Sequence, residues 1–73
     1  MTITIFGTTK DNIYESSFNG DVMNIIKYFD TYIENAKRIL DKEGAKPYMY
    51  IVWEKKDFGK IEDLTPEIIK QYE

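Results

Sequence analysis

The chain contains no cysteine and no histidine among its 73 residues. Without a thiol it can form no disulfide and offers no thiolate nucleophile. Without an imidazole it has no ordinary proton shuttle near neutral pH. These absences exclude Ser-His-Asp and Cys-His catalysis and the common zinc sites, whose ligands are cysteine and histidine. A chain without disulfides suits a reducing compartment, and we expect it in the cytoplasm.

Long apolar runs and glycine-rich motifs are also missing. No run approaches the roughly 18 apolar residues that span a bilayer, and the opening sequence MTITIFGTTKD lacks the basic and apolar regions of a signal peptide. The four glycines stand singly, which excludes P-loop and dinucleotide-binding motifs. Residues 57–59 read DFG, as in protein kinases, but the chain is too short for that fold and a hairpin turn explains the triplet. We therefore expect no membrane contact and no nucleotide cofactor.

Composition and length restrict the architecture further. We expect one domain over residues 1–73, and a chain this short buries only about 60% of the surface that its unfolded form exposes. Isoleucine occurs 11 times and lysine nine times, against two alanines and one arginine. This bias is typical of AT-rich genomes and favours a low-GC bacterium, its phages or its mobile elements as the source. The net charge of −3 is concentrated in residues 1–36, which carry five acids against two bases.

The N-terminal region predicts a β-hairpin. In residues 2–6 (TITIF), Ile3 and Ile5 alternate with threonines, which is typical of a strand. Residues 7–12 predict a turn. Residues 13–18 predict a second, weaker strand that pairs with the first.

Residues 21–43 predict one long amphipathic helix. Apolar side chains recur at spacings of four and three, and two adjacent rows of them make a broad face suited to lying across a sheet. Asn19 or Asp21 can cap the start of the helix, and Gly44 can end it in a left-handed conformation. The rows consist of Val22, Ile26, Phe29, Ile33, Ala36 and Leu40, and of Ile25, Phe29, Tyr32, Ala36 and Ile39.

The C-terminal region predicts two more strands and a short helix. Residues 48–53 (YMYIVW) are apolar on both faces, which favours a central strand. A turn with Gly59 at the position of positive φ and a short edge strand at 60–63 follow. Thr65 and Pro66 are typical of a helix start. The predicted fold is α+β, a small antiparallel sheet in ββαββα order with the long helix packed on one face and a short C-terminal helix.

Aromatic side chains suggest the function. Six tyrosines and one tryptophan exceed what a core of this size can hide, and these residue types are the usual anchors of protein interfaces. We expect a non-catalytic protein-binding module, a small inhibitor or adaptor from a phage or mobile element that sterically blocks a larger host protein, or that forms a homodimer. Its acidic N-terminal half would complement a basic site. The predicted partner-binding residues are Tyr28, Asp30, Glu34, Tyr48, Tyr50, Lys55 and Lys56.

A single-stranded nucleic-acid binder is the main alternative. Tyr48 and Tyr50 on one strand face, with lysines around them, would form a stacking platform. Residues 41–60 carry five bases against four acids, however, so the local charge of about +1 is weak for gripping phosphates. Acidic side chains that imitate phosphates are a less favoured variant. The C-terminal helix could also cover the Tyr48/Tyr50 face, which would leave it in the core.

Catalysis by carboxylates is the least favoured class. Asp30 and Glu34 lie one helical turn apart on the polar face of the predicted helix, as solvated residues commonly do. Glu62 and Asp63 alternate sides of the predicted edge strand and do not converge. The segment at residues 11–21 is rich in oxygen ligands but does not meet the EF-hand spacing. We expect no enzyme, no cofactor and no metal site.

Overall fold

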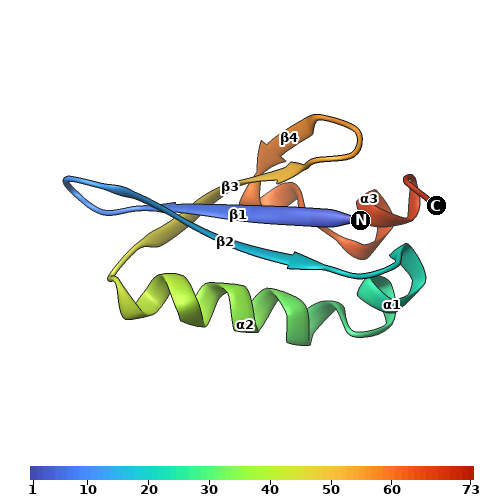
Figure 1. Cartoon of the computed structure of the whole chain (residues 1–73), viewed down its shortest axis with the longest axis horizontal. Helices are drawn as coiled ribbons and strands as arrows, with labels where there is room; N and C mark the ends of the chain where they lie inside the picture. The colour runs from blue at the N-terminus through green and yellow to red at the C-terminus, as the bar shows by residue number, and fades with distance from the viewer.

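Four strands form one antiparallel sheet in the order β2-β1-β3-β4, and the helices pack against it (Figure 1). The computed structural model describes all residues, 1–73. It confirms the predicted α+β fold, with strands, helices and a C-terminal helix in the order ββαββα. The elements are β1 (Thr2–Thr8), β2 (Ile13–Asn19), α1 (Val22–Lys27), α2 (Phe29–Lys42), β3 (Lys46–Val52), β4 (Asp57–Lys60), the 3₁₀ helix η1 (Ile61–Asp63) and α3 (Pro66–Lys70).

The core lies between the sheet and the helices. Ile3 and Ile5 of β1 are fully buried, as their alternation with threonine predicts. α2 runs along this face of the sheet, while α1 packs against α3 at one end (Figure 1). At the other end β1 passes so close beneath α2 that a Cβ on Gly7 would lie 3.2 Å from the Leu40 Cδ1 and Ala45 Cβ atoms. Ten apolar residues make up the core: Ile3, Ile5, Ile25, Ala36, Leu40, Ala45, Tyr50, Val52, Leu64 and Ile69.

The predicted single helix over 21–43 is divided in two at Tyr28. Tyr28 has φ −113° and ψ 32°, outside helical values, yet its N–H still donates to the Asn24 carbonyl at 3.0 Å. A straight helix of that length would measure about 34 Å, whereas a seven-residue strand measures only about 23 Å. The bend brings α1 back over the sheet end, where Ile25 is fully buried near α3. The predicted start and end of this helical region are confirmed. Asp21 caps α1, and Gly44 follows α2 with φ 68°.

The predicted turn and edge strand near Gly59 are shifted along the chain. The turn occupies residues 53–56, with Lys56 rather than Gly59 in the left-handed region (φ 55°). β4 already begins at Asp57, and the predicted strand at 60–63 is mostly the 3₁₀ helix η1. Gly59 lies within β4 opposite Tyr50, where a Cβ would stand 3.0 Å from the Tyr50 hydroxyl. Glycine is therefore needed at position 59 because the Tyr50 side chain leaves no room for a Cβ, and not because of a turn.

The C-terminal helix begins as predicted. The Thr65 side chain accepts a hydrogen bond from the Ile68 N–H at 3.3 Å, and Pro66 occupies the first turn. Leu64 and Ile69 are both buried, so this short helix closes the end of the core. None of the helices has the length and apolar character that crossing a membrane requires.

Candidate functional site

The helices cover only one face of the sheet. Directly paired residues on neighbouring strands point to the same face, so the strand register defines which side chains share the other one. We call this other surface the open sheet face. One row across it contains Glu15, Phe6, Met49 and Lys60, and the next contains Ser17, Thr4, Ile51 and Phe58.

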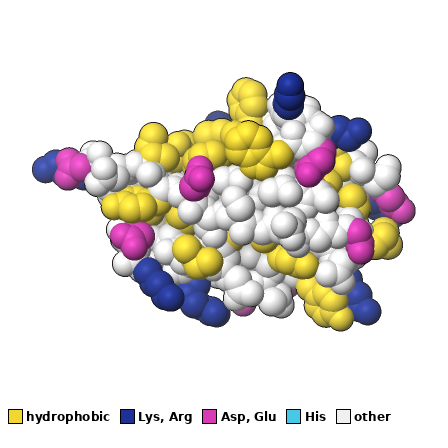
Figure 2. Space-filling view, viewed as in Figure 1, with side chains coloured by type: hydrophobic (Ala, Val, Ile, Leu, Met, Phe, Trp, Pro, Cys, Tyr) yellow, Lys and Arg dark blue, Asp and Glu magenta, His cyan; other side chains and the backbone are white.

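Large apolar side chains dominate the open sheet face. Phe58 is 73% exposed, Ile13 68% and Trp53 50%, while the others are partly buried among their neighbours. In Figure 2, hydrophobic side chains gather along the upper side of the molecule, over β3 and β4 and away from α2. Monomeric proteins rarely expose a contiguous apolar patch of this kind to water unless the patch is a binding surface. Its apolar members are Phe6, Ile13, Met49, Ile51, Trp53 and Phe58.

Hydrogen bonds tie Trp53 to β1. The Trp53 Nε1 donates to the Thr4 hydroxyl at 2.6 Å, and that hydroxyl also pairs with the Ser17 hydroxyl at 2.6 Å. The Trp53 N–H donates to the Thr2 carbonyl at 3.1 Å. In return the Thr2 N–H donates to the Glu54 Oε1 at 2.9 Å, and this bond lowers the pKa of the Glu54 carboxyl. The β3–β4 turn is therefore tied to the start of β1.

Tyr50 does not present its ring to solvent. It is 6% exposed and lies on the helix-covered face of β3, among the core residues. Burial is the main reason that its pKa is raised, with smaller contributions from Asp63 and Asp57. The predicted Tyr48/Tyr50 binding face is therefore corrected: it is the face that α2 and the C-terminal segment cover. The surface left open is that of Met49, Ile51 and Trp53 on the opposite side of the same strand.

Tyr48, unlike Tyr50, is partly exposed, and an irregularity in β3 accounts for this. The β1–β3 register pairs Phe6 with Met49 but Gly7 with Pro47, so Tyr48 is an extra residue on β3. Such a bulge turns a side chain out of its regular alternation. Tyr48 is 38% exposed.

Lys55 and Lys56 both lie exposed in the β3–β4 turn, between the exposed acids Glu54 and Asp57. The charge of the turn is therefore mixed. On the open sheet face itself, Lys60 lies at the β4 border and Glu15 at the opposite border, on β2. One row across the face therefore has apolar side chains between an acidic residue and a basic residue.

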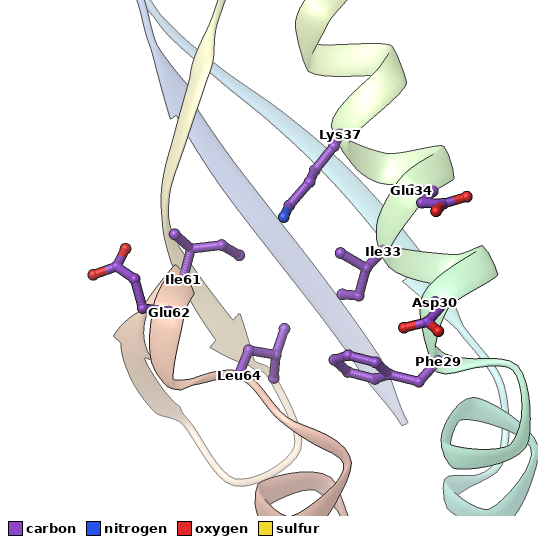
Figure 3. Close-up of a pocket in the computed structure, with 8 residues that line it drawn as sticks. All are labelled: Phe29, Asp30, Ile33, Glu34, Lys37, Ile61, Glu62 and Leu64. Carbon is purple, nitrogen blue, oxygen red and sulfur yellow. The ribbon is translucent and has the colours of Figure 1, made fainter.

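Tyr28, Asp30 and Glu34 all lie exposed on the helical side of the molecule. Tyr28 is 48% exposed, and the Lys27 ammonium lies 5.4 Å from the centre of its ring. Asp30 and Glu34 line a groove of about 400 Å³ between α2 and η1. Figure 3 shows the apolar side chains of the two walls pointing toward one another, while Lys37 reaches into the groove and Glu34 and Glu62 point away from it. The lining residues are Phe29, Asp30, Ile33, Glu34, Lys37, Ile61, Glu62 and Leu64.

The acidic side chains of this groove do not form a metal-binding cluster. No group of three or more of them stands close enough to hold a metal ion. Glu62 and Asp63 lie in η1 rather than in a strand. The groove is a partly apolar concavity with charged residues of both signs at its border.

Comparison with known proteins finds no matching family model, no matching curated protein and no matching solved structure.

Trp53 and Phe58 are the functional candidates that the sequence prediction missed. Alternation along β3 placed Trp53 with Met49 and Ile51 on one face, but it gave no indication of which face the helices cover. The signal was in β1, whose Ile3 and Ile5 must face the core, because antiparallel pairing then puts Tyr50 beside Ile5. Phe58 was missed because residues 55–60 were interpreted as a turn.

Proposed function

We propose that this chain is a non-catalytic protein-binding module, a small inhibitor or adaptor that acts by steric occlusion. The observation that carries the proposal is the amount of aromatic surface left exposed in so small a globule, by Trp53 and Phe58 on the open sheet face and by Tyr28 on the helical side. The accessible surface of the chain is 5002 Å², and a standard protein interface takes about 800 Å² from each partner. One contact of ordinary size would therefore occupy about a sixth of the molecule.

The helical side supplies the second part of the proposal. Tyr28 offers an exposed ring and shares a hollow with Asp30, while Asp30 and Glu34 border the groove between α2 and η1. These exposed acids suit a larger protein with a basic, partly apolar site, because a long basic side chain can lay its stem on apolar surface and its head beside a carboxylate. The isoleucine- and lysine-rich composition supports a phage or mobile element as the source.

Affinity capture with matched variants tests this function. We expect the wild-type chain to retain one host protein at fixed stoichiometry. Tyr28→Ala and Asp30→Lys should each reduce capture at least tenfold, whereas Lys10→Glu, in the distant β1–β2 turn, should leave it unchanged. Equal capture by all four chains, or none by the wild type, contradicts the proposal.

A second candidate is single-stranded nucleic-acid binding on the open sheet face. It is favoured by the exposed Trp53 and Phe58 rings with Lys55, Lys56 and Lys60 beside them, since bases stack on such rings and lysines contact phosphates. The net charge of −3 speaks against it. Salt-sensitive binding of a single-stranded oligonucleotide that is lost in Phe58→Ala and weakened in Lys56→Glu would establish this function in place of the first.

A further inference from the structure

We propose that the open sheet face is the contact between two copies of this chain, which pack face to face about a two-fold axis parallel to the strands. The inference rests on the proposed function, because it names the polypeptide that covers this face. It follows from the arrangement of charge across the sheet.

One row of the face is complementary to itself. In the order β2-β1-β3-β4 it reads Glu15, Phe6, Met49 and Lys60, with an acid at one border, a base at the other and apolar side chains between them. A two-fold axis that runs parallel to the strands, between β1 and β3, exchanges the two borders. Glu15 of each copy then faces Lys60 of the other, and Phe6 faces Met49. Two opposite-charge contacts and one continuous apolar layer result.

Other symmetric arrangements are less favourable. A two-fold axis along the row would place Glu15 on Glu15 and Lys60 on Lys60, and such like-charge contacts cost energy. The parallel axis also suits the shape of twisted sheets, which pack face to face with their strands aligned to within about 30°. In this arrangement the second row brings Thr4 opposite Ile51 and Ser17 opposite Phe58.

The area is that of a weak, reversible dimer. β1, β2 and β3 are seven residues long and β4 is four, so strands spaced about 4.8 Å apart at about 3.3 Å per residue give a footprint of about 400 Å². Burying this footprint on both copies removes roughly 800 Å² from water in total, which is typical of weak and transient contacts. The exposed Phe58 and Trp53 rings contribute a large share, since a buried aromatic side chain covers about 150–250 Å².

Dimerisation through this face leaves the helical side free. α2 lies on the opposite side of the sheet (Figure 1), so a dimer carries the surface of Tyr28, Asp30 and Glu34 twice, on its two outer sides. The larger protein would then meet a bivalent module, and the second contact would add avidity wherever two of its sites are within reach.

Charge reversal and mixing test the arrangement. Sedimentation equilibrium of the wild-type chain should show a monomer–dimer equilibrium in the micromolar range. Glu15→Lys and Lys60→Glu should each weaken self-association at least tenfold, because each makes two like-charge contacts. The double variant E15K/K60E, and an equimolar mixture of the two single variants, should restore association. The controls Lys10→Glu and Glu43→Lys, whose exposed residues lie off the face, should behave as the wild type.

The outcomes separate this inference from the proposed function. A wild-type chain that stays monomeric at several hundred micromolar overturns the dimer, and so does a mixture that associates no better than the single variants. If Phe58→Asp nonetheless abolishes capture of the host protein, the open sheet face binds that protein directly and the proposed function stands. If Phe58→Asp changes neither self-association nor capture, both the dimer and the role of the face in the proposed function are wrong.

Discussion

The Thr4 hydroxyl accepts a hydrogen bond from the Trp53 indole Nε1 at 2.6 Å, although the two residues are 49 positions apart in the sequence. Thr4 is 1% exposed on a sheet face that no helix covers, so its shelter comes from the side chains of that face. The bond turns the indole down onto β1 and fixes its orientation. A ring held in this way loses little further freedom when a partner covers it, which favours binding.

Removing the indole donor should weaken the fold slightly. We expect Trp53→Phe to lower the free energy of unfolding by about 1 kcal/mol, the usual net value of one intramolecular hydrogen bond. Thr4→Val should cost a similar amount, because it removes the acceptor. The double variant should cost less than the sum of the two, since both changes remove the same bond. Urea unfolding of all four chains measures this coupling, and strictly additive values would contradict the bond.

Gly59 should tolerate no side chain. A Cβ there would stand 3.0–3.1 Å from three atoms of the buried Tyr50 ring, and overpacking of this kind costs about 1–3 kcal/mol. We expect Gly59→Ala to lower the free energy of unfolding by that amount. In a Tyr50→Phe background the loss should be smaller, because the closest contact, to the hydroxyl, is gone.

Gly44→Ala provides the contrast for Gly59→Ala. No atom lies within 4 Å of its Cβ position, but its φ of 68° is unfavourable for alanine, which costs about 1 kcal/mol. Changing Tyr50 should leave this loss unaltered. Equal sensitivity of the two glycine variants to Tyr50→Phe, measured by thermal unfolding, would show that the ring does not constrain Gly59.

The order of the elements could be predicted because local patterns determine it. The alternation of Ile3 and Ile5 with threonine, the cap at Thr65 and the left-handed stop at Gly44 each follow from neighbouring residues alone. The bend at Tyr28 could not be predicted in the same way, since the apolar period continues through it without a proline or glycine. It arises from the length of the sheet, which a straight helix would exceed.

The candidate site was predicted less well than the fold. Tyr28, Asp30 and Glu34 are exposed on one side as their helical positions suggested, but Tyr50 proved to be a core residue. Both faces of β3 are apolar, so which face remains open is decided by pairing with β1 and by the position of the helices. Those contacts join residues far apart in the chain, and the local pattern of β3 carries no information about them.

Tyr72 should ionise well above the pH at which a free tyrosine does. Its hydroxyl donates to the Asp57 Oδ2 at 2.9 Å, and partial burial together with this carboxylate raises the pKa of Tyr72 to about 12. Its pKa in the unfolded chain is about 10. Folding therefore favours the neutral phenol, so its contribution to stability is complete below about pH 10 and is lost as the pH rises from about 10 to 12.

A comparison with Tyr72→Phe checks this dependence. We expect the wild type to be more stable than the variant at about pH 9, and the difference to shrink as Tyr72 ionises. Ultraviolet titration of tyrosinate should show a group that ionises near pH 12 in the wild type and is missing in the variant. If the tyrosine that is present only in the wild type ionises near pH 10 instead, the hydrogen bond to Asp57 does not raise the pKa of Tyr72.

Replacing Lys56 in the β3–β4 turn with glycine should make the fold more stable. Lys56 has φ 55°, a conformation that costs a residue with a Cβ about 1–2 kcal/mol, whereas glycine adopts it freely. Glycine also gives the unfolded chain more freedom, which offsets part of the gain. We therefore expect Lys56→Gly to raise the free energy of unfolding by about 0.5–1 kcal/mol.

Lys55→Gly is the matched control, because it removes the same charge from the same turn at a residue that has no positive φ. It should give no gain in stability, and a gain equal to that of Lys56→Gly would show that lost charge, not relieved strain, is responsible.

The same pair of variants separates protein binding from nucleic-acid binding. On a nucleic-acid surface both variants should weaken oligonucleotide binding about equally, because each loses one phosphate contact. On a protein surface anchored by Trp53 and Phe58, both should leave self-association within about threefold of the wild type.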